Sequence, residues 1–208
     1  MIELVTTDGI FALDGGEWEV TNNIWLVGDD KEVAVFDAAH DHGPIVDAVN
    51  GRRVTAIVLT HGHNDHINAA VALRDAVDAP ILLNTDDAML WDVVYPDATT
   101  DGAVVPGSIL KAGGHELGVL HTPGHSPGCC CFYDAASSLV ISGDTLFCGG
   151  PGATGRSYSD EPTILASIRD ELLILPDSTV VHTGHGDATT IADERERVLD
   201  RIAELGVG

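Results

Sequence analysis

The sequence predicts an α/β (α+β) protein in which two β-sheets pack together and helices cover their outer surfaces. Short apolar, β-branched runs bounded by Gly, Asp and Ser predict pairs of strands, and segments of helical period fall between these pairs. Each sheet or helix with one apolar face must bury it, so strand pairs flanked by helices favour stacked layers. With 208 residues, of which 44% are hydrophobic and 21% charged, we expect one domain over residues 1–208.

The first half of the chain predicts strands interrupted by two helices. Residues 24–27 and 33–36 form a hairpin-like pair around the Gly28-Asp29-Asp30 turn. A short helix over 44–50 has Pro44 in its first turn and Gly51 after its end, an asymmetry typical of helices. Strands follow at 54–59 and 80–83, and an Ala-rich helix lies between them at about 67–77.

The second half repeats this pattern. Strands are expected at 108–110 and 116–121, around the Gly113-Gly114 turn, and at 129–133 and 139–142, joined by a turn at 134–137. A helix over about 162–173 carries its apolar residues on one side, a strand follows at 179–182, and a last helix covers about 191–205. The Gly-, Ser- and Thr-rich segment 149–160 is typical of a long functional loop.

The charge and the cysteine content limit which partners and which cellular compartment are expected. The net charge of −23, from 33 acidic and 10 basic residues, repels phosphate backbones and anionic lipid, so we expect neither nucleic acid nor a membrane as partner. The N-terminus lacks a basic-then-apolar pattern, which favours the cytoplasm. Three of the four cysteines are consecutive and point alternately to opposite faces of a strand, so reduced thiols are expected, with Cys148 in a packing role.

A cluster of metal-ligand side chains follows the strand at 54–59: His61, His63, Asp65 and His66. Imidazole and carboxylate are ligands that Zn²⁺, Fe²⁺ and Mn²⁺ share. Four groups on one short loop do not easily converge on one ion, which favours two adjacent ions and calls for further ligands. Three candidates occur in Gly-containing loops after strands: His125, Asp144 and His185.

This ordered set, HxHxDH followed by His, Asp and His, resembles the metallo-β-lactamase superfamily over nearly the whole chain. The resemblance implies a four-layer αββα sandwich with a dinuclear site at one edge. It implies that the first metal is held by His61, His63 and His125, the second by Asp65, His66 and His185, and that Asp144 bridges both. Asp37 matches a carboxylate that supports the metal loops, whereas His40 and His42 are left without an assigned role.

The chemistry expected of two metals about 3.5–4 Å apart is hydrolysis by a bridging hydroxide, which Asp65 orients and whose proton it later carries. A bridging aspartate at position 144 argues against the β-lactamases themselves. The segment 143–147 with Gly149-Gly150 looks like glyoxalase II, the hydroxyacylglutathione hydrolases, whose next loop binds the thiol carrier through a basic residue and a tyrosine. Arg156 and Tyr158 match these two positions.

The chain ends about 23 residues after His185, and it resembles the compact, single-domain bacterial branch of these enzymes. The segment 150–156 looks like actinobacterial members, in which mycothiol replaces glutathione. We therefore expect a metal-dependent hydrolase of thioesters of a low-molecular-weight thiol, with two divalent ions, zinc first and iron or manganese as alternatives. A persulfide dioxygenase with a single Fe(II) and a lactonase are the alternative enzymes; metal identity, acyl group, thiol carrier and oligomeric state stay open.

Overall fold

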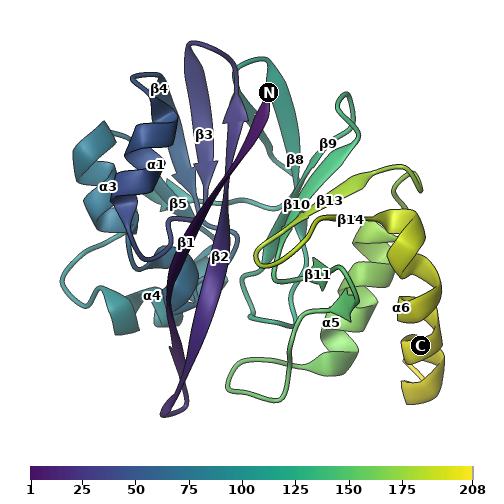
Figure 1. The fold of residues 1–208 in the computed structure, drawn as a ribbon. Coiled ribbons are helices and arrows are strands. Elements are labelled where there is room, and N and C mark those ends of the chain that lie inside the picture. The colour runs from purple at the N-terminus through teal and green to yellow at the C-terminus, as the bar shows by residue number, and fades with distance from the viewer. Residues whose placement is uncertain (208) are drawn as a thin grey trace.

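The computed structural model, which describes residues 1–207, contains two six-stranded sheets packed face to face with helices on both outer surfaces (Figure 1). Helices α1, α3 and α4 lie on one side of the pair, and α5 and α6 lie on the other. The predicted four-layer αββα sandwich is therefore confirmed.

The first sheet has the strand order β1-β2-β3-β4-β5-β6. Its first three strands are antiparallel, and β3 to β6 run parallel to one another. The strands are β1 (Ile2–Leu13), β2 (Gly16–Gly28), β3 (Glu32–Phe36), β4 (Arg53–Val58), β5 (Ile81–Leu83) and β6 (Gly102–Ala103).

The second sheet has the order β14-β13-β10-β9-β8-β7, in which only the β10–β13 pair is parallel. A two-stranded sheet, β11 with β12, follows β10. These strands are β7 (Ile109–Ala112), β8 (His115–His121), β9 (Cys130–Asp134), β10 (Leu139–Gly143), β11 (Leu146–Phe147), β12 (Gly150–Pro151), β13 (Val180–Thr183) and β14 (Thr189–Thr190).

The helices connect strands across the outer faces. They are α1 (His42–Val49), α2 (Asn64–Ile67), α3 (Ala70–Val77), the 3₁₀ turn η1 (Thr85–Asp87), α4 (Ala88–Val94), α5 (Glu161–Ser167), the π turn η2 (Ile168–Leu172) and α6 (Ile191–Leu205). Caps fix their ends: the side chain of Asp41 accepts from Gly43 N at the start of α1, and Asn50 ends it in the left-handed region. None of the helices within residues 1–207 is both long enough and apolar enough to cross a bilayer.

Three buried layers of apolar side chains hold the four layers of backbone together. Alternation along β2 sends Ile24 and Leu26 toward the helices on the first sheet and Trp25 and Val27 toward the second sheet. The cysteines of β9 divide in the same way: Cys130 packs between the sheets and Cys131 under α5 and α6. All four cysteines are free thiols, and only Cys148 is exposed.

The strand β1 and the first half of β2 were not predicted. They form a long antiparallel ribbon, paired from Ile2↔Val27 to Leu13↔Gly16, which we call the β1–β2 arm (Figure 1). Much of the arm is exposed, and apolar side chains such as Leu4 and Ile10 occupy its exposed positions, so its sequence does not alternate in step with its burial. The seven-residue helix α4 was also missed.

Two predicted helices are interrupted. The helix expected at about 67–77 is interrupted between α2 and α3, because two of its backbone groups form hydrogen bonds with the segment after β3. Ala38 N donates to His66 O, and Ala69 N donates to Ala38 O. The helix expected over 162–173 begins as α5 and widens into the π turn η2, where Leu173 N donates to Ile168 O, five residues back. The apolar residues expected on one side of that segment, among them Ile164 and Leu172, are buried as predicted.

Candidate metal centre

The loop after β4 and the short helix α2 present four of the expected ligands at the edge of the first sheet. His61 and His63 lie in the extended segment, and Asp65 and His66 follow on α2. All four side chains are buried. Gly62 has no room for a side chain, since a Cβ there would touch Leu90 and Asp87.

The second sheet supplies the other three residues from the ends of its strands. His125 lies in the loop between β8 and β9, Asp144 follows β10, and His185 follows β13. The strands β10 and β13 are parallel neighbours, so the residues that follow them emerge side by side. A Cβ at Gly184 would overlap Asp144 Oδ1, which explains the need for glycine next to His185.

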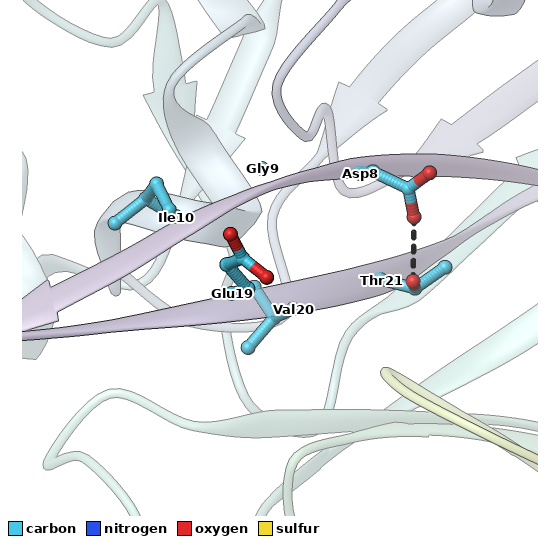
Figure 2. Close-up of a pocket in the computed structure, with 6 residues that line it drawn as sticks. All are labelled: Asp8, Gly9, Ile10, Glu19, Val20 and Thr21. Carbon is cyan, nitrogen blue, oxygen red and sulfur yellow. Dashed lines mark hydrogen bonds between the residues drawn. The ribbon is translucent and has the colours of Figure 1, made fainter.

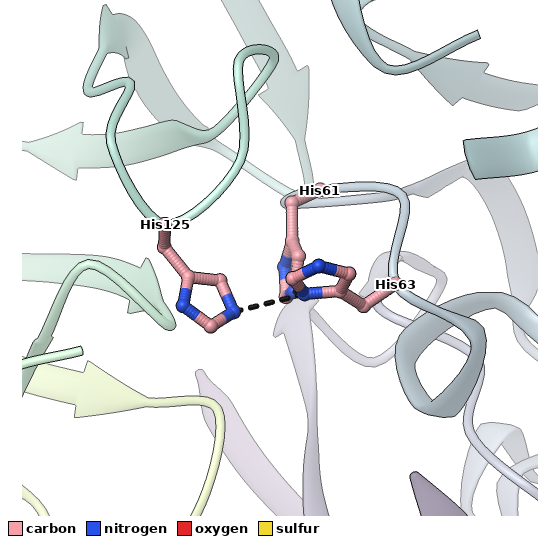
Figure 3. Close-up of side chains that lie close together, drawn as sticks. All are labelled: His61, His63 and His125. Atoms are coloured by element: carbon pink, nitrogen blue, oxygen red, sulfur yellow. Dashed lines mark hydrogen bonds between the residues drawn. The ribbon is translucent and has the colours of Figure 1, made fainter. Parts of the chain in front are cut away.

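Three imidazoles gather in the first group, as Figure 3 shows for His61, His63 and His125. The Nδ1 atom of His63 lies 3.1 Å from His61 Nε2 and 2.9 Å from His125 Nε2. Ligand nitrogens about 2.0–2.1 Å from one tetrahedral Zn²⁺ lie about 3.4 Å apart. The three nitrogens therefore have nearly the spacing that a shared ion requires.

The second group consists of Asp65, His66 and His185. His185 Nε2 lies 3.2 Å from His66 Nε2 and 3.4 Å from Asp65 Oδ2. Asp144 lies between the two groups: its Oδ1 is 3.3 Å from His66 Nε2, and its Oδ2 is 3.5 Å from His125 Nε2. The structure thus brings all seven expected ligands together and puts Asp144 where a bridging carboxylate would lie.

The outward nitrogens of two rings lie against backbone carbonyls. His125 Nδ1 lies 2.8 Å from the carbonyl of Ala153, and His185 Nδ1 lies 2.8 Å from the carbonyl of Thr21. Because a carbonyl only accepts, each Nδ1 donates the hydrogen bond, so in the neutral form that binds a metal each ring turns a bare Nε2 toward the centre. Such outer hydrogen bonds orient metal-binding histidines.

Asp37 orients the first and the last histidine of the HxHxDH motif, His61 through Thr60 and His66 directly. Its Oδ2 lies 2.8 Å from His66 Nδ1 and accepts from the hydroxyl of Thr60 at 3.0 Å. That hydroxyl in turn lies 3.0 Å from His61 Nδ1. The structure therefore puts Asp37 behind the candidate ligands, where the sequence analysis expected it.

Asp87 is a supporting residue that the sequence analysis missed. Its fully buried carboxylate accepts from Gly62 N at 2.7 Å, Ser126 Oγ at 2.6 Å and Gly128 N at 2.6 Å. These donors belong to the loops that carry His61, His63 and His125. Burial raises the pKa of Asp87, although the three donors oppose this shift. No local pattern marks Asp87, since it connects segments 25 to 41 residues away.

The electrostatics of the two groups differ. Burial lowers the pKa of His63 to about 3 and that of His61 well below its ordinary value, so these rings are neutral, as ligands must be. Burial also lowers the pKa of His185, but Asp144 and Asp65 outweigh it and raise this pKa to about 10. The carboxylates of the second group therefore attract positive charge.

These donor atoms fit divalent cations. The Nε2 atoms of His66 and His185 lie 3.2 Å apart, so two neutral rings would repel each other unless a positive charge, a proton or a metal ion, lay between them. Asp65 Oδ1 and Asp144 Oδ1 are buried without a hydrogen-bond donor. Imidazole nitrogens and carboxylate oxygens in two adjoining groups are the donor set of Zn²⁺ and of first-row neighbours such as Fe²⁺ and Mn²⁺.

Two polar residues beside Asp65 were not assigned a role from the sequence. Asn22 Nδ2 donates to Asp65 Oδ2 at 3.1 Å, and Asn22 Oδ1 lies 2.9 Å from His40 Nε2. Asn22 comes from β2, so only the pairing of distant segments could have indicated it. His40 is thus connected to the site through Asn22, whereas His42 begins α1.

A cavity of about 260 Å³ opens over the candidate ligands. Arg156 lies on its wall, as expected, together with the aromatic side chains of Phe11, Trp18 and Phe147. Tyr158 is not among the lining residues; it is 54% exposed and has a φ of 69°. The structure therefore brings Arg156, but not Tyr158, to the cavity wall.

A second, more open cavity of about 470 Å³ follows the β1–β2 arm (Figure 2). Asp8, Glu19 and Thr21 line it, and the Thr21 hydroxyl donates to Asp8. It adjoins the first cavity, because Val20 lines both. Its acidic side chains are exposed, in contrast to the buried carboxylates of the metal centre.

An αββα sandwich with paired histidine and aspartate groups at its strand ends defines a metallo-hydrolase class of protein. The chain belongs to the metallo-beta-lactamase superfamily, whose family model matches residues 18–185. The superfamily and the metal-binding hydrolase class expected from the sequence are thereby confirmed.

Two relatives cover most of the chain. YqgX of Bacillus subtilis, a probable metallo-hydrolase, is 34% identical over 190 residues, which cover 85% of this chain and 90% of that protein. The hydroxyacylglutathione hydrolase GloC of Haemophilus influenzae is 33% identical over 187 residues, covering 83% of this chain and 87% of that protein.

Two solved structures are similar in both fold and sequence. The BLEG-1 B3 metallo-beta-lactamase has a TM-score of 0.76 at 29% identity and covers 91% of this chain and 97% of its own. TTHA1623, solved in a di-iron-bound form, has a TM-score of 0.73 at 32% identity and covers 85% of this chain and 93% of its own.

Proposed function

We propose that this protein hydrolyses thioesters of a low-molecular-weight thiol, as glyoxalase II-like enzymes do. The observation that carries the proposal is one cavity whose wall holds the guanidinium of Arg156 together with five of the seven candidate ligands: His63, Asp65, His125, Asp144 and His185. The similarity to the hydroxyacylglutathione hydrolase GloC supports it.

The proposed ligands of the first ion are His61, His63 and His125, and those of the second are Asp65, His66 and His185, with Asp144 shared. Zinc is our first expectation, and iron or manganese would suit the same donors. Such a pair, when bound, lowers the pKa of a water and stabilises the oxyanion formed from a carbonyl.

The chain's own residues then orient the reactants. Asp65 is held by Asn22 through one oxygen, at 3.1 Å, while its other oxygen has no donor. We assign Asp65 the role of orienting the attacking water and accepting its proton, which a carboxylate within hydrogen-bond reach can do.

Arg156 is proposed to bind an anionic group of the thiol carrier, because a guanidinium can hold a carboxylate by two parallel hydrogen bonds. Tyr158 belongs to the same loop and is exposed, so its proposed contact with the carrier lies outside the cavity. Both assignments concern the carrier half of the substrate, and neither touches the scissile bond.

The test is a hydrolysis screen of the zinc-, iron- and manganese-loaded protein, with metal content measured on the same samples. Substrates are S-lactoylglutathione, an S-acyl mycothiol, a lactone panel and a β-lactam. We expect turnover of a thioester and its loss in Asp144→Ala, while the exposed control Asp97→Ala keeps it. Thioester rates equal to buffer would defeat the proposal.

The other arms of the screen identify the alternatives. Hydrolysis confined to lactones would identify the protein as a lactonase. Cleavage of the β-lactam would indicate a β-lactamase activity, as in the name of BLEG-1. A single bound iron, with oxygen uptake on glutathione persulfide, would indicate a persulfide dioxygenase instead.

A further inference from the structure

Arg156 lacks a carboxylate partner in a strongly acidic chain. The formal charge is −23, and acidic residues outnumber basic ones 33 to 10. Within residues 1–207, every other arginine lies within salt-bridge distance of a carboxylate: Arg52, Arg53, Arg74, Arg169, Arg195, Arg197 and Arg201. The half-buried Arg156 has no such partner within salt-bridge distance, although its charge helps to lower the pKa of Asp14, so its N–H donors remain available to an external anion.

Aromatic rings hold this guanidinium instead. Its central carbon lies 3.7 Å from the centroid of the Trp18 ring and 5.1 Å from that of Phe11. Both distances fall within the range of cation–π attraction. The rings also contact each other, with centroids 5.5 Å apart. A cation held by ring faces keeps its N–H donors available, which a salt bridge would not allow.

The same rings reach the candidate metal centre. Phe11 packs against His63 with ring centroids 5.3 Å apart and an interplanar angle of 62°. The four side chains therefore form a continuous stack in the order His63, Phe11, Trp18, Arg156. Its members all line the cavity.

The β1–β2 arm is fixed in the position that this stack requires. Asn64, which lies between His63 and Asp65, donates to Ile10 O and accepts from Ala12 N, each at 2.8 Å. At the tip, Asp14 accepts from Ser157 N at 2.9 Å, next to Arg156. The arm is thus attached both to the ligand segment and to the loop that carries the arginine.

We propose that Trp18, supported by Phe11, is a specificity-determining positioning residue of the thioesterase site. It holds Arg156 on the cavity wall as an unpaired cation, and the site thereby prefers thioesters whose thiol carrier bears a carboxylate over those with a neutral carrier. This inference rests on the proposed function and adds the residue that positions the arginine.

The experiment compares two thioesters with the same acyl group: S-lactoylglutathione, whose carrier is anionic, and S-lactoyl-N-acetylcysteamine, whose carrier is neutral. The proteins are the wild type, Trp18→Leu, Trp18→Phe and Arg156→Met. Leu4→Ala, at an exposed position of β1, the strand of the arm that pairs with β2, is the control. All are metal-loaded, and their thermal midpoints are compared to confirm folding.

We expect Trp18→Leu and Arg156→Met to raise KM for the glutathione thioester about 10-fold, the loss of one charge-assisted contact, with kcat little changed. KM for the neutral thioester should stay within about twofold of wild type. Trp18→Phe should recover most of the loss, because a phenyl ring also attracts the cation. Equal losses on the two substrates would overturn the inference and leave the hydrolase proposal intact.

A spectroscopic measurement separates this inference from the hydrolase proposal. The ring current of Trp18 should move the side-chain Nε–H and δ-methylene proton signals of Arg156 upfield in the wild type, and Trp18→Leu should return them to ordinary positions. If the wild type cleaves neither thioester, the proposed function fails while this signature still reports the stack. Identical Arg156 signals in both proteins would overturn the inference whatever the activity.

Discussion

The carboxylate of Asp37 and the imidazole of His66 are joined by a 2.8 Å hydrogen bond in the interior of the molecule. Asp37 follows β3 and His66 lies on α2, so the contact ties the end of a strand to the candidate ligand segment. Since this bond fixes the proton on Nδ1, it also determines that His66 presents Nε2 to the centre.

Removing this bond should weaken metal binding. We expect Asp37→Asn to lower the affinity of the second group by 10–100-fold, as is usual when an outer partner of a metal-binding histidine is lost. Asparagine tolerates the left-handed backbone of position 37, whose φ is 62°, so the effect reports the charge and the hydrogen bonds. Competition with a chromophoric chelator measures the affinity, and an unchanged value would show that Asp37 does not support the centre.

Asp87 should matter for stability even without metal. In Asp87→Asn, an amide group replaces one of the oxygens that accept from Gly62, Ser126 and Gly128, and it leaves buried donors unsatisfied. We expect the free energy of unfolding of the chelator-treated protein to fall by about 1–3 kcal/mol in urea. The neighbouring, exposed Asp86→Asn is the control and should stay within about 0.5 kcal/mol of wild type.

Metal removal should destabilise the fold as well as abolish activity. A ligand present at 100 times its Kd stabilises the folded state by about 2.7 kcal/mol, which corresponds to roughly 5–10 °C for a chain of this size. We expect chelation to lower the thermal midpoint by that amount and added zinc to restore it. In Asp144→Ala the midpoint should respond far less to zinc; a full response would argue against the shared role of Asp144.

His182 should add a pH dependence that is independent of the metal centre. Burial lowers its pKa to about 4, against about 6.5 in the unfolded chain, and its ring packs on Trp25 with centroids 4.4 Å apart. Between pH 4 and 6.5 the unfolded chain binds more protons, so the stability that the neutral ring contributes is complete above pH 6.5 and is lost as the pH falls toward 4.

Replacing this histidine should therefore flatten the stability profile. We expect the free energy of unfolding of His182→Gln to fall less than that of wild type between pH 7 and 4, by about 2 kcal/mol after allowance for the partly exposed ring. Urea titrations of the chelator-treated proteins at several pH values give this difference. Parallel profiles for the two proteins would refute the assignment.

The seven candidate ligands were identifiable from the sequence because they share local signs. Each follows an apolar strand, several are flanked by glycine, and their types are those that bind first-row metals. The layer order was also predictable, since alternation along strands such as β2 records which side chains face each neighbouring layer. Arg156 was found through its position in the loop after Asp144.

Other features depend on contacts between segments that are distant in the sequence. The sequence of the β1–β2 arm does not alternate with its burial, because apolar side chains such as Leu4 and Ile10 lie at exposed positions, yet the arm supplies Phe11, Trp18 and Asn22 to the site. Likewise, nothing near Asp87 in the sequence indicates that two ligand loops converge on it. Periodicity reports only the local burial of a segment, whereas the partners of an exposed ribbon or a lone buried carboxylate depend on how the whole chain packs.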